Sequence, residues 1–147
     1  MIFYVAAPFF NVPQNETLTH IEALLTSLNF AYISPRKSGL ILKDMTPEHR
    51  KVVAPAVYRK NVNDLKIADG VVAVIDDFDP GTIWEMGFAA ALEKHHIYTY
   101  TGRGYGVNVM LAGCVRGHAK GMPQLREMLN AVKNGTTTDH FTVDAAT

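Results

Sequence analysis

Residues 70–75 (GVVAVI) form an unbroken apolar run, followed at once by an acidic turn at 76–82 (DDFDPGT) and a second apolar stretch. The run is short and rich in valine, which predicts a buried strand, and the stretch after the turn predicts a helix. In this order Asp79 lies in the turn and Glu85 near the start of the helix, both beyond the end of a strand. A carboxylate held there either has a chemical function or is a costly way to begin a helix.

Further strands are expected elsewhere in the chain. The expected strands lie at residues 2–7, 30–33, 70–75 and 96–101, with a short fifth near 116–120. Segments in which apolar residues recur at helical spacing separate them. Strands that alternate with helices indicate a parallel sheet covered on both faces. We therefore expect an α/β fold, a doubly wound sheet of about five strands in a single domain over residues 1–147.

Start and stop signals predict where the helices lie. The first helix, which contains Leu18, is expected to be capped by Asn15 or Thr17. The second begins at residues 46–48 (TPE), because proline fits a first turn, and Pro55 is expected to break or kink it. The remaining expectations are helical segments at about 56–68, 83–94 and 123–133, a helical or irregular segment at 108–115, exposed or flexible loops at 34–45 and 102–106, and a polar tail at 134–147.

The carboxyl ends of the strands are the expected place for a site. In parallel α/β sheets, ligands bind beyond these ends, near a switch in strand order. The segments Ala6–Phe10, Asp76–Glu85 and Thr101–Met110 follow three of the expected strands. We therefore expect these three segments to converge.

The helix that carries Glu85 is apolar nearly all round, which predicts that it is largely buried. A buried ionised Glu needs a partner or a function. The simpler alternative is a first-turn Glu that favours the helix N-terminus. The neighbouring Asp77, Asp79 and Gly81 favour a functional role, since a glycine in such a turn lets a ligand approach the backbone and the first N–H groups of the helix can hold a polar group.

Two neighbouring carboxylates suit several kinds of chemistry, of which sugar chemistry is one. One carboxylate can attack an anomeric carbon and form a covalent glycosyl-enzyme, while the other accepts hydrogen bonds from sugar hydroxyls. Carboxylates also stabilise the positive charge of the transition state. The turn has neither the Gly-Lys-Ser/Thr of a phosphate-binding P-loop nor a G-x-G-x-x-G dinucleotide motif.

Composition excludes several other classes of protein. Lys plus Arg and Asp plus Glu number 14 each, so charge does not favour a nucleic acid polymer or an anionic membrane as partner. No apolar run is long enough for a membrane helix, and residues 1–7 predict a strand and not a signal peptide. The single Cys114 excludes an internal disulfide and fits a reducing cytoplasm. His95 and His96 are adjacent, which is poor spacing for a metal pair.

Four motifs together resemble the nucleoside 2-deoxyribosyltransferase family. They are residues 4–10 (YVAAPFF) with Gln14 and Asn15, residues 61–69 (NVNDLKIAD), residues 79–87 (DPGTIWEMG) and residues 108–110 (NVM). The pattern Asp-x-Gly-Thr-x-x-Glu-x-Gly is the most specific, although related N-glycosidases share it. The likeness extends from the first strand to about residue 115.

The resemblance implies a flavodoxin-like fold and a retaining exchange of nucleobases on free deoxyribonucleosides, in nucleotide salvage, without a cofactor or metal. Glu85 matches the nucleophile that attacks C1′, and Asp79 matches the residue that binds the sugar hydroxyls, especially O5′. Tyr4 is expected to hold the Glu85 carboxylate. Phe10, Asn61, Asp77 and Gly81 are further candidates for substrate binding.

The resemblance also implies an oligomer. The family is built from dimers, commonly as a hexamer, and Asn108 and Met110 are expected to reach into the site of a neighbouring subunit. One departure concerns the nucleobase, because several members carry an Asp where this chain has Asn61. An amide cannot act as a proton donor in the way a carboxylic acid can. Asp64 or Asp69 are the candidate replacements, although Asp69 is better placed to end a helix.

Two alternatives to the transferase remain open. One is a deoxynucleoside 5′-monophosphate N-glycosidase, which uses water as acceptor and needs donors around the phosphate. Arg36, Lys37 and Arg103 are expected to be solvated loop charges, with a phosphate site as the alternative. Asn108 favours a free 5′-hydroxyl, since it carries no charge. The other alternative is a non-catalytic nucleotide-binding domain, because fold alone does not determine function.

Overall fold

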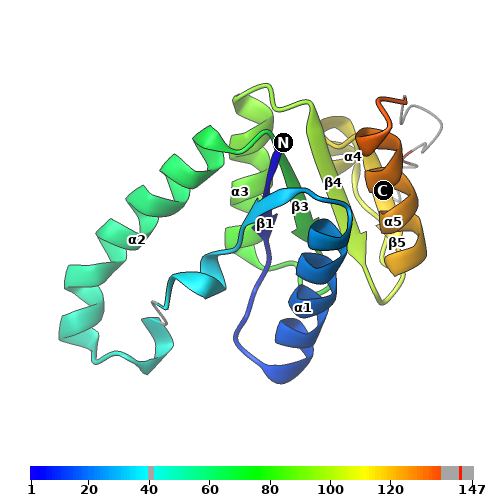
Figure 1. The fold of residues 1–147 in the computed structure, drawn as a ribbon. Coiled ribbons are helices and arrows are strands. Elements are labelled where there is room, and N and C mark those ends of the chain that lie inside the picture. Colours follow the sequence, from blue (N-terminus) through cyan, green and yellow to red (C-terminus); the bar gives the residue numbers. More distant parts are fainter. Residues whose placement is uncertain (40–41, 137–142, 144–147) are drawn as a thin grey trace.

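A five-stranded parallel sheet forms the centre of the computed structural model, which describes residues 1–39, 42–136 and 143 (Figure 1). The strand order is β2-β1-β3-β4-β5, which is the flavodoxin-like order, and it confirms the expected doubly wound α/β class. The strands are β1 (Ile2–Ala6), β2 (Ala31–Ile33), β3 (Gly70–Val74), β4 (His96–Thr101) and β5 (Gly117–Lys120). Strand order reverses between β1 and β3, which is where such sheets bind ligands.

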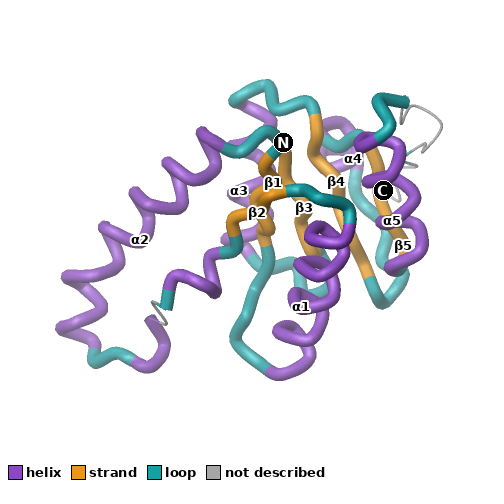
Figure 2. Tube along the Cα trace, in the orientation of Figure 1, coloured by secondary structure: helices purple, strands orange, loops and turns teal. Residues whose placement is uncertain are grey.

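Helices cover both faces of the sheet (Figures 1 and 2). The helices α1 (Val12–Ser27) and α5 (Met122–Lys133) pack on one face, and α2 (Pro47–Ile67), α3 (Pro80–Ala91) and α4 (Val109–Cys114) on the other. The N-terminal half of α2 reaches away from the sheet in Figure 1. None of the helices in the described part of the chain has the length and hydropathy needed to cross a membrane.

Alternation along β1 directs its side chains to two separate cores. Phe3 and Val5 join the core beneath α1 and α5, whereas Tyr4 and Ala6 join the core beneath α2 and α3. Successive side chains of a strand point to opposite faces, so Tyr4 necessarily faces the helix that carries Glu85.

Two helices begin earlier than their sequence signals indicated. The predicted caps of α1 are wrong: Asn11 is the cap, and its side chain accepts a hydrogen bond from the Gln14 N–H. Similarly, α3 begins at Pro80 and is capped by Asp79, so Glu85 lies beyond the first turn and is not a first-turn Glu. In both helices a proline occupies the first turn, where its missing N–H leaves no hydrogen bond unmade.

The helix α2 runs without interruption through Pro55, so the expected break is wrong. Pro55 is exposed, and the carbonyl that loses its amide partner can be hydrated by water. The predicted loop at 34–45 contains two short 3₁₀ turns, Pro35–Ser38 and Leu42–Asp44, with residues 40–41 outside the described part. Most of the predicted polar tail also lies outside it.

Candidate functional site

Tyr4 and Glu85 form a direct contact at the centre of the site. The Tyr4 hydroxyl donates a hydrogen bond to Glu85 Oε1 at 2.6 Å, and Tyr4 is fully buried at 0% exposure. These residues are 81 positions apart, and they meet because β1 and α3 pack together on the same face of the sheet. The predicted partnership of Tyr4 with Glu85 is thus present in the geometry.

The surroundings of Glu85 shift its proton equilibrium. Burial raises the pKa of the Glu85 carboxyl to about 7, the Tyr4 hydrogen bond opposes this rise, and the charge of Asp79 adds to it. Burial and the neighbouring charge of Glu85 also raise the pKa of Tyr4 well above its ordinary value. At neutral pH, part of the Glu85 population is therefore ionised although it is desolvated. The Tyr4 phenol stays protonated and donates its hydrogen bond to this carboxylate.

Asp79 and Gly81 shape the turn beside this pair. Asp79 Oδ2 accepts hydrogen bonds from the Thr82 backbone N–H at 2.9 Å and from the Thr82 hydroxyl at 3.1 Å. A Cβ at Gly81 would lie 3.0 Å from the same Asp79 oxygen, so a larger residue would crowd it. The helix start therefore fixes one oxygen of Asp79 and keeps the space around that oxygen open.

Asp76, which the sequence analysis did not single out, anchors the loop after β4. Its carboxylate accepts hydrogen bonds from the backbone N–H of Gly102 at 2.9 Å, from the N–H of Arg103 at 3.2 Å and from the Thr101 hydroxyl. The sequence signal for this role was its position two residues after the end of β3, next to β4 in the sheet. The predicted convergence of the turn with the loop after β4 is present through these contacts.

Asp77 joins the turn to the segment after β1. It accepts hydrogen bonds from Gln14 Nε2 at 2.8 Å and from Arg103 Nη1 at 3.0 Å, while Gln14 Oε1 accepts one from the Phe10 N–H at 2.7 Å. All three predicted segments therefore meet at one edge of the sheet. The substrate-binding role of Asp77 stays a prediction, since its two oxygens already have protein donors.

A cavity of about 340 Å³ lies between the turn and α4. Phe78 lines it with a left-handed backbone (φ 45°), and its ring packs 5.4 Å from the ring of Tyr105. Asn108 and Met110 line the same cavity. The Asn108 side chain caps α4 by accepting from the Leu111 N–H at 3.0 Å, whereas Met110 is 77% exposed. Their predicted role in a neighbouring site stays a prediction.

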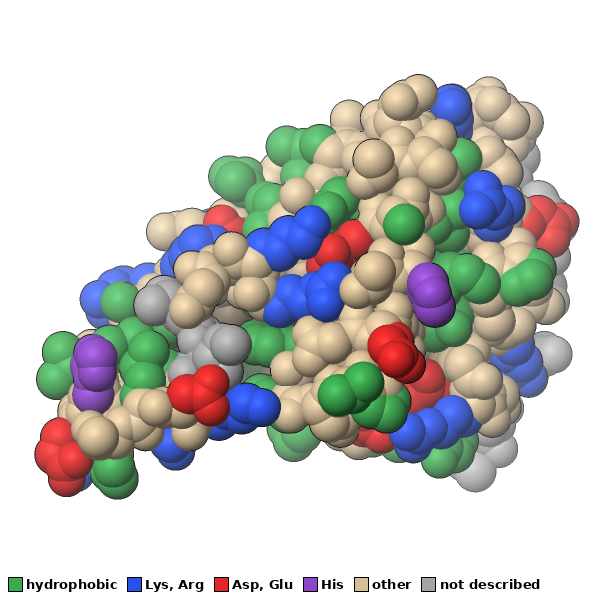
Figure 3. Space-filling view, turned by 60° about the horizontal axis from the view of Figure 1, so that its bottom comes forward, with side chains coloured by type: hydrophobic (Ala, Val, Ile, Leu, Met, Phe, Trp, Pro, Cys, Tyr) green, Lys and Arg blue, Asp and Glu red, His purple; other side chains and the backbone are tan. Residues whose placement is uncertain are grey.

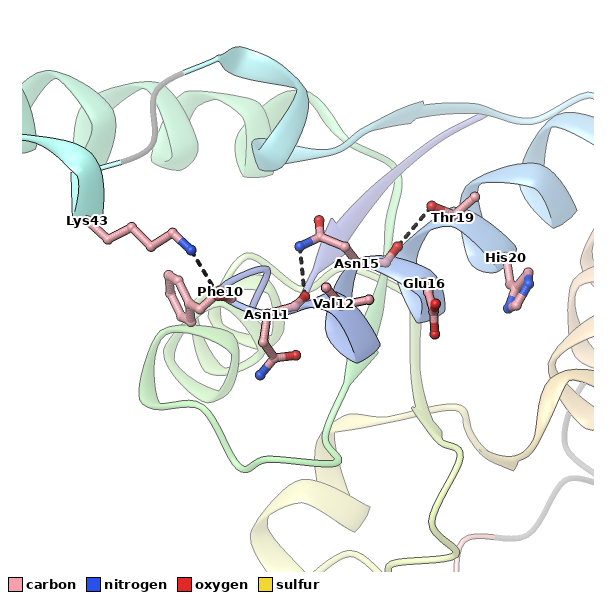
Figure 4. A pocket seen from close by; sticks show the side chains of 8 residues that line it. All are labelled: Phe10, Asn11, Val12, Asn15, Glu16, Thr19, His20 and Lys43. Atoms are coloured by element: carbon pink, nitrogen blue, oxygen red, sulfur yellow. Dashed lines mark hydrogen bonds between the residues drawn. The ribbon is translucent and has the colours of Figure 1, made fainter.

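Phe10 lies at the rim of a larger cavity of about 770 Å³ (Figure 4). Phe10 is 53% exposed, and its ring stacks on that of Phe9 with a centroid distance of 5.5 Å. Lys43 reaches across from the second 3₁₀ turn, and its ammonium donates to the Phe10 carbonyl at 2.9 Å. This cavity is lined by none of Tyr4, Asp79 and Glu85, so a role of Phe10 in binding the base stays a prediction.

The two candidate replacements for an acid near the base lie in different places. Asp69 accepts a hydrogen bond from the Ile2 N–H at 2.7 Å, at the start of β1 and thus at the opposite end of the sheet. Asp64 lies near Tyr4, whose pKa its charge raises. Asn61 is half-buried on the same helix, α2.

The basic residues of the loops have protein partners. Arg36 donates to both oxygens of the buried Glu22 at 2.8 Å, so the expectation of a solvated loop charge is wrong for Arg36. Lys37 is exposed but lies 3.2 Å from the same carboxylate. Figure 3, which turns the carboxyl ends of the strands toward the reader, shows basic and acidic side chains interspersed. In the described part of the chain, no cluster of three or more His, Cys, Asp or Glu side chains is arranged to hold a metal.

The fold and the site define an α/β protein of flavodoxin-like topology with a carboxylate-centred site beyond its strand ends. The sequence model of the nucleoside 2-deoxyribosyltransferase family matches residues 3–137. The chain belongs to this family.

Solved structures share the fold. The 2-deoxyribosyltransferase of Bacillus psychrosaccharolyticus is 24% identical over 100% of both chains, with a TM-score of 0.72. The CMP N-glycosidase BcmB of Clostridium botulinum is 14% identical over 88% of this chain and 99% of its own, with a TM-score of 0.58. A conserved protein from Enterococcus faecalis V583 is 17% identical over 96% of this chain and 79% of its own, with a TM-score of 0.51. A comparison with curated proteins gives no match.

Proposed function

We propose that this protein transfers 2-deoxyribose between nucleobases on free deoxyribonucleosides, through a covalent glycosyl-enzyme on Glu85. The observation that carries the proposal is the 2.6 Å hydrogen bond from Tyr4 to a desolvated Glu85 whose pKa is about 7. A desolvated carboxylate is a stronger nucleophile than a hydrated one, and its orientation is held by the phenol. Family membership supports the substrate class, and a cytoplasmic salvage role accords with it.

The reaction divides into two displacements at C1′. In the first, Glu85 attacks C1′ while the glycosidic C–N bond breaks; the departing base takes the electron pair and then a proton from solvent water. Tyr4 occupies Oε1, which leaves Oε2 to attack. In the second, a nitrogen of the incoming base attacks C1′ and gives up its proton to solvent water, and Glu85 departs as a carboxylate. Two inversions give overall retention.

Asp79 is proposed to hold the sugar. One of its oxygens is fixed by Thr82, and the carboxylate lies close enough to Glu85 to raise its pKa. A carboxylate in this position accepts hydrogen bonds from sugar hydroxyls and stabilises positive charge at C1′. Gly81 keeps space beside it, and Phe10 and Asn61 are the proposed contacts on the base side.

A homo-oligomer with shared sites is part of the proposal. The expectation that α3 is largely buried is wrong for the single chain, because Trp84 on this helix is 46% exposed. The Trp84 ring stacks on Phe88 at 5.1 Å and lies 5.7 Å from Tyr58, which is 58% exposed. These three rings form an apolar patch, which suits contact with a second copy of the chain.

The second candidate is hydrolysis of a deoxynucleoside 5′-monophosphate. It is favoured by the fold shared with the CMP N-glycosidase and by Arg103, whose guanidinium lies at the carboxyl edge of the sheet. The pairing of Arg103 with Asp77 at 3.0 Å counts against it, since the carboxylate neutralises the cation and repels a phosphate. The convergence of Tyr4, Asp79 and Glu85 favours an enzyme over a non-catalytic nucleotide-binding domain.

A base-exchange assay tests the proposal. The protein is incubated with a deoxynucleoside and a different free base, and separately with a deoxynucleoside monophosphate in water. We expect a new deoxynucleoside in the first reaction and no release of base in the second. Glu85→Ala should abolish exchange, whereas Glu127→Ala, at an exposed position of α5, should retain it. Release of base from the monophosphate alone would favour the hydrolase, and full exchange by Glu85→Ala would refute the covalent mechanism.

A further inference from the structure

The side chain of Gln14 joins two segments that follow different strands of the sheet. Its Oε1 accepts a hydrogen bond from the Phe10 N–H at 2.7 Å, after β1, and its Nε2 donates to Asp77 Oδ2 at 2.8 Å, after β3. One end of the amide faces a donor and the other faces a carboxylate, so only one orientation of the amide satisfies both. Gln14 is half-buried in the first turn of α1, where its own N–H bonds to the capping Asn11.

Side chains hold the backbone around Phe10, which lies beyond the end of β1. Asn15 Nδ2 donates to the Phe9 carbonyl at 3.0 Å. The Lys43 ammonium donates to the Phe10 carbonyl at 2.9 Å, and Gln14 accepts from the Phe10 N–H. The Phe10 ring, which stacks on Phe9, therefore depends on these contacts for its position. Among these three side chains, Gln14 is the one that also bonds to the acidic turn.

Building on the proposed function, we propose that Gln14 is a positioning residue that fixes the base side of the site relative to the sugar side. Phe10 is the proposed contact to the base, and Asp77 lies two residues before Asp79, the proposed contact to the sugar. Gln14 touches no substrate in this role and acts through the two segments that it joins. Without this bridge the Phe10 segment moves relative to the turn, which weakens binding of the base more than it slows the chemistry at C1′.

The bridge between Gln14 and Asp77 can be reversed by substitution. Gln14→Glu keeps an oxygen for the Phe10 N–H but sets a carboxylate against Asp77, and a negative charge in the first turn does not itself weaken α1. Asp77→Asn keeps an oxygen for Arg103 but sets an NH₂ group against the NH₂ group of Gln14. Each single variant therefore breaks the bridge, and the double variant restores it with donor and acceptor interchanged.

Steady-state kinetics of the transfer reaction measure the effect on the site. We expect the KM for the free acceptor base to rise about threefold to tenfold in each single variant, as for the loss of one hydrogen bond. The kcat should stay within about twofold of the native value, because the contacts at C1′ remain. The double variant should recover the native KM. A bridge that only stabilised the fold would lower the stability of the single variants and leave KM unchanged.

Hydrogen exchange of the Phe10 amide, followed by NMR, reports on the bridge without any enzymatic activity. This exchange should accelerate in Asp77→Asn, although the substitution lies in another segment, because Gln14 loses the partner that holds it. The double variant should return the Phe10 amide to its native exchange rate.

Gln124→Glu is the matched control. Gln124 accepts from the N–H of Lys120, four residues earlier, at the same 2.7 Å, but it lies at the start of α5 after the edge strand β5. It should change neither KM nor the Phe10 amide. An unchanged KM in both single variants, or a double variant no better than either, would overturn the inference. If the Phe10 amide responds as expected but no base is transferred, the coupling of the two segments stands and the proposed function fails.

Discussion

Burial in the folded protein disfavours the ionised form of Glu85. Burial is the largest cause of its raised pKa, which is about 7 compared with an ordinary value of 4.5. The folded protein therefore binds this proton more tightly than the unfolded chain. The stability that Glu85 contributes is fully present below about pH 4.5 and is lost as the pH rises through about 7. A nucleophile held in this way is expected to reduce stability at the pH where it works.

Glu85→Gln should therefore stabilise the protein at high pH. The neutral amide keeps an oxygen that accepts from Tyr4 and avoids the burial of a charge. We expect the free energy of unfolding at pH 8 to rise by roughly 1–3 kcal/mol, and the gain to shrink toward pH 4. Denaturant unfolding at several pH values measures this, with the exposed Glu127→Gln as control. A gain that does not depend on pH would contradict the burial argument.

At the scale of elements, the turn between β3 and α3 connects the parts of the site. Asp76 binds the loop after β4, Asp77 binds the segment after β1, and Asp79 caps α3. Asp76 is half-buried and satisfies two backbone N–H groups, whereas the contact of Asp77 with Arg103 is exposed and screened by solvent. The two adjacent aspartates therefore differ in their importance for stability.

Asp76→Ala should destabilise the protein by about 1–3 kcal/mol, because it leaves the backbone N–H of Gly102 without its acceptor and removes one of the two acceptors of the Arg103 N–H. Asp77→Ala should cost less, since exposed ion pairs contribute little. Denaturant unfolding compares the two variants, and amide hydrogen exchange at Gly102 and Arg103 locates the effect. Equal losses in both variants, or unchanged exchange at Gly102 in Asp76→Ala, would show that Asp76 is not the anchor of this loop.

At the scale of the whole molecule, the rings of Tyr58, Trp84 and Phe88 form an apolar patch on α2 and α3. Trp84→Glu places a charge in it and should dissociate a homo-oligomer, because an unpaired charge is strongly disfavoured in a buried interface. Light scattering coupled to size-exclusion chromatography measures the mass. Ala23→Glu, at an exposed position of α1, should leave the mass unchanged. A monomeric native protein, or an unaltered mass in Trp84→Glu, would refute the shared-site arrangement.

Much of the fold followed from periodicity. The run at 70–75 predicted β3 nearly to the residue, because a strand buried on both faces is apolar throughout. The segment 96–101, rich in Tyr and Thr, predicted β4, because aromatic and β-branched residues favour strands. Helix starts were less predictable, since Asn11 and Asp79 act as caps ahead of a proline and before any apolar spacing begins. The continuity of α2 through Pro55 was also beyond the sequence, because it depends on whether the freed carbonyl reaches solvent.

The sequence by itself determined the class of fold and the candidate carboxylates Asp79 and Glu85, and its resemblance to the family supplied the expectation that Tyr4 contacts Glu85. It did so because strand alternation and a specific local motif are properties of neighbouring residues. The tertiary structure alone decided that Asp64 lies near Tyr4 and that Asp69 lies at the far end of the sheet. It also decided that Asp76 accepts hydrogen bonds from the loop after β4 and that Arg36 pairs with the carboxylate of Glu22. These contacts join residues distant in the chain, and only the packing of helices on the sheet brings them within reach of one another.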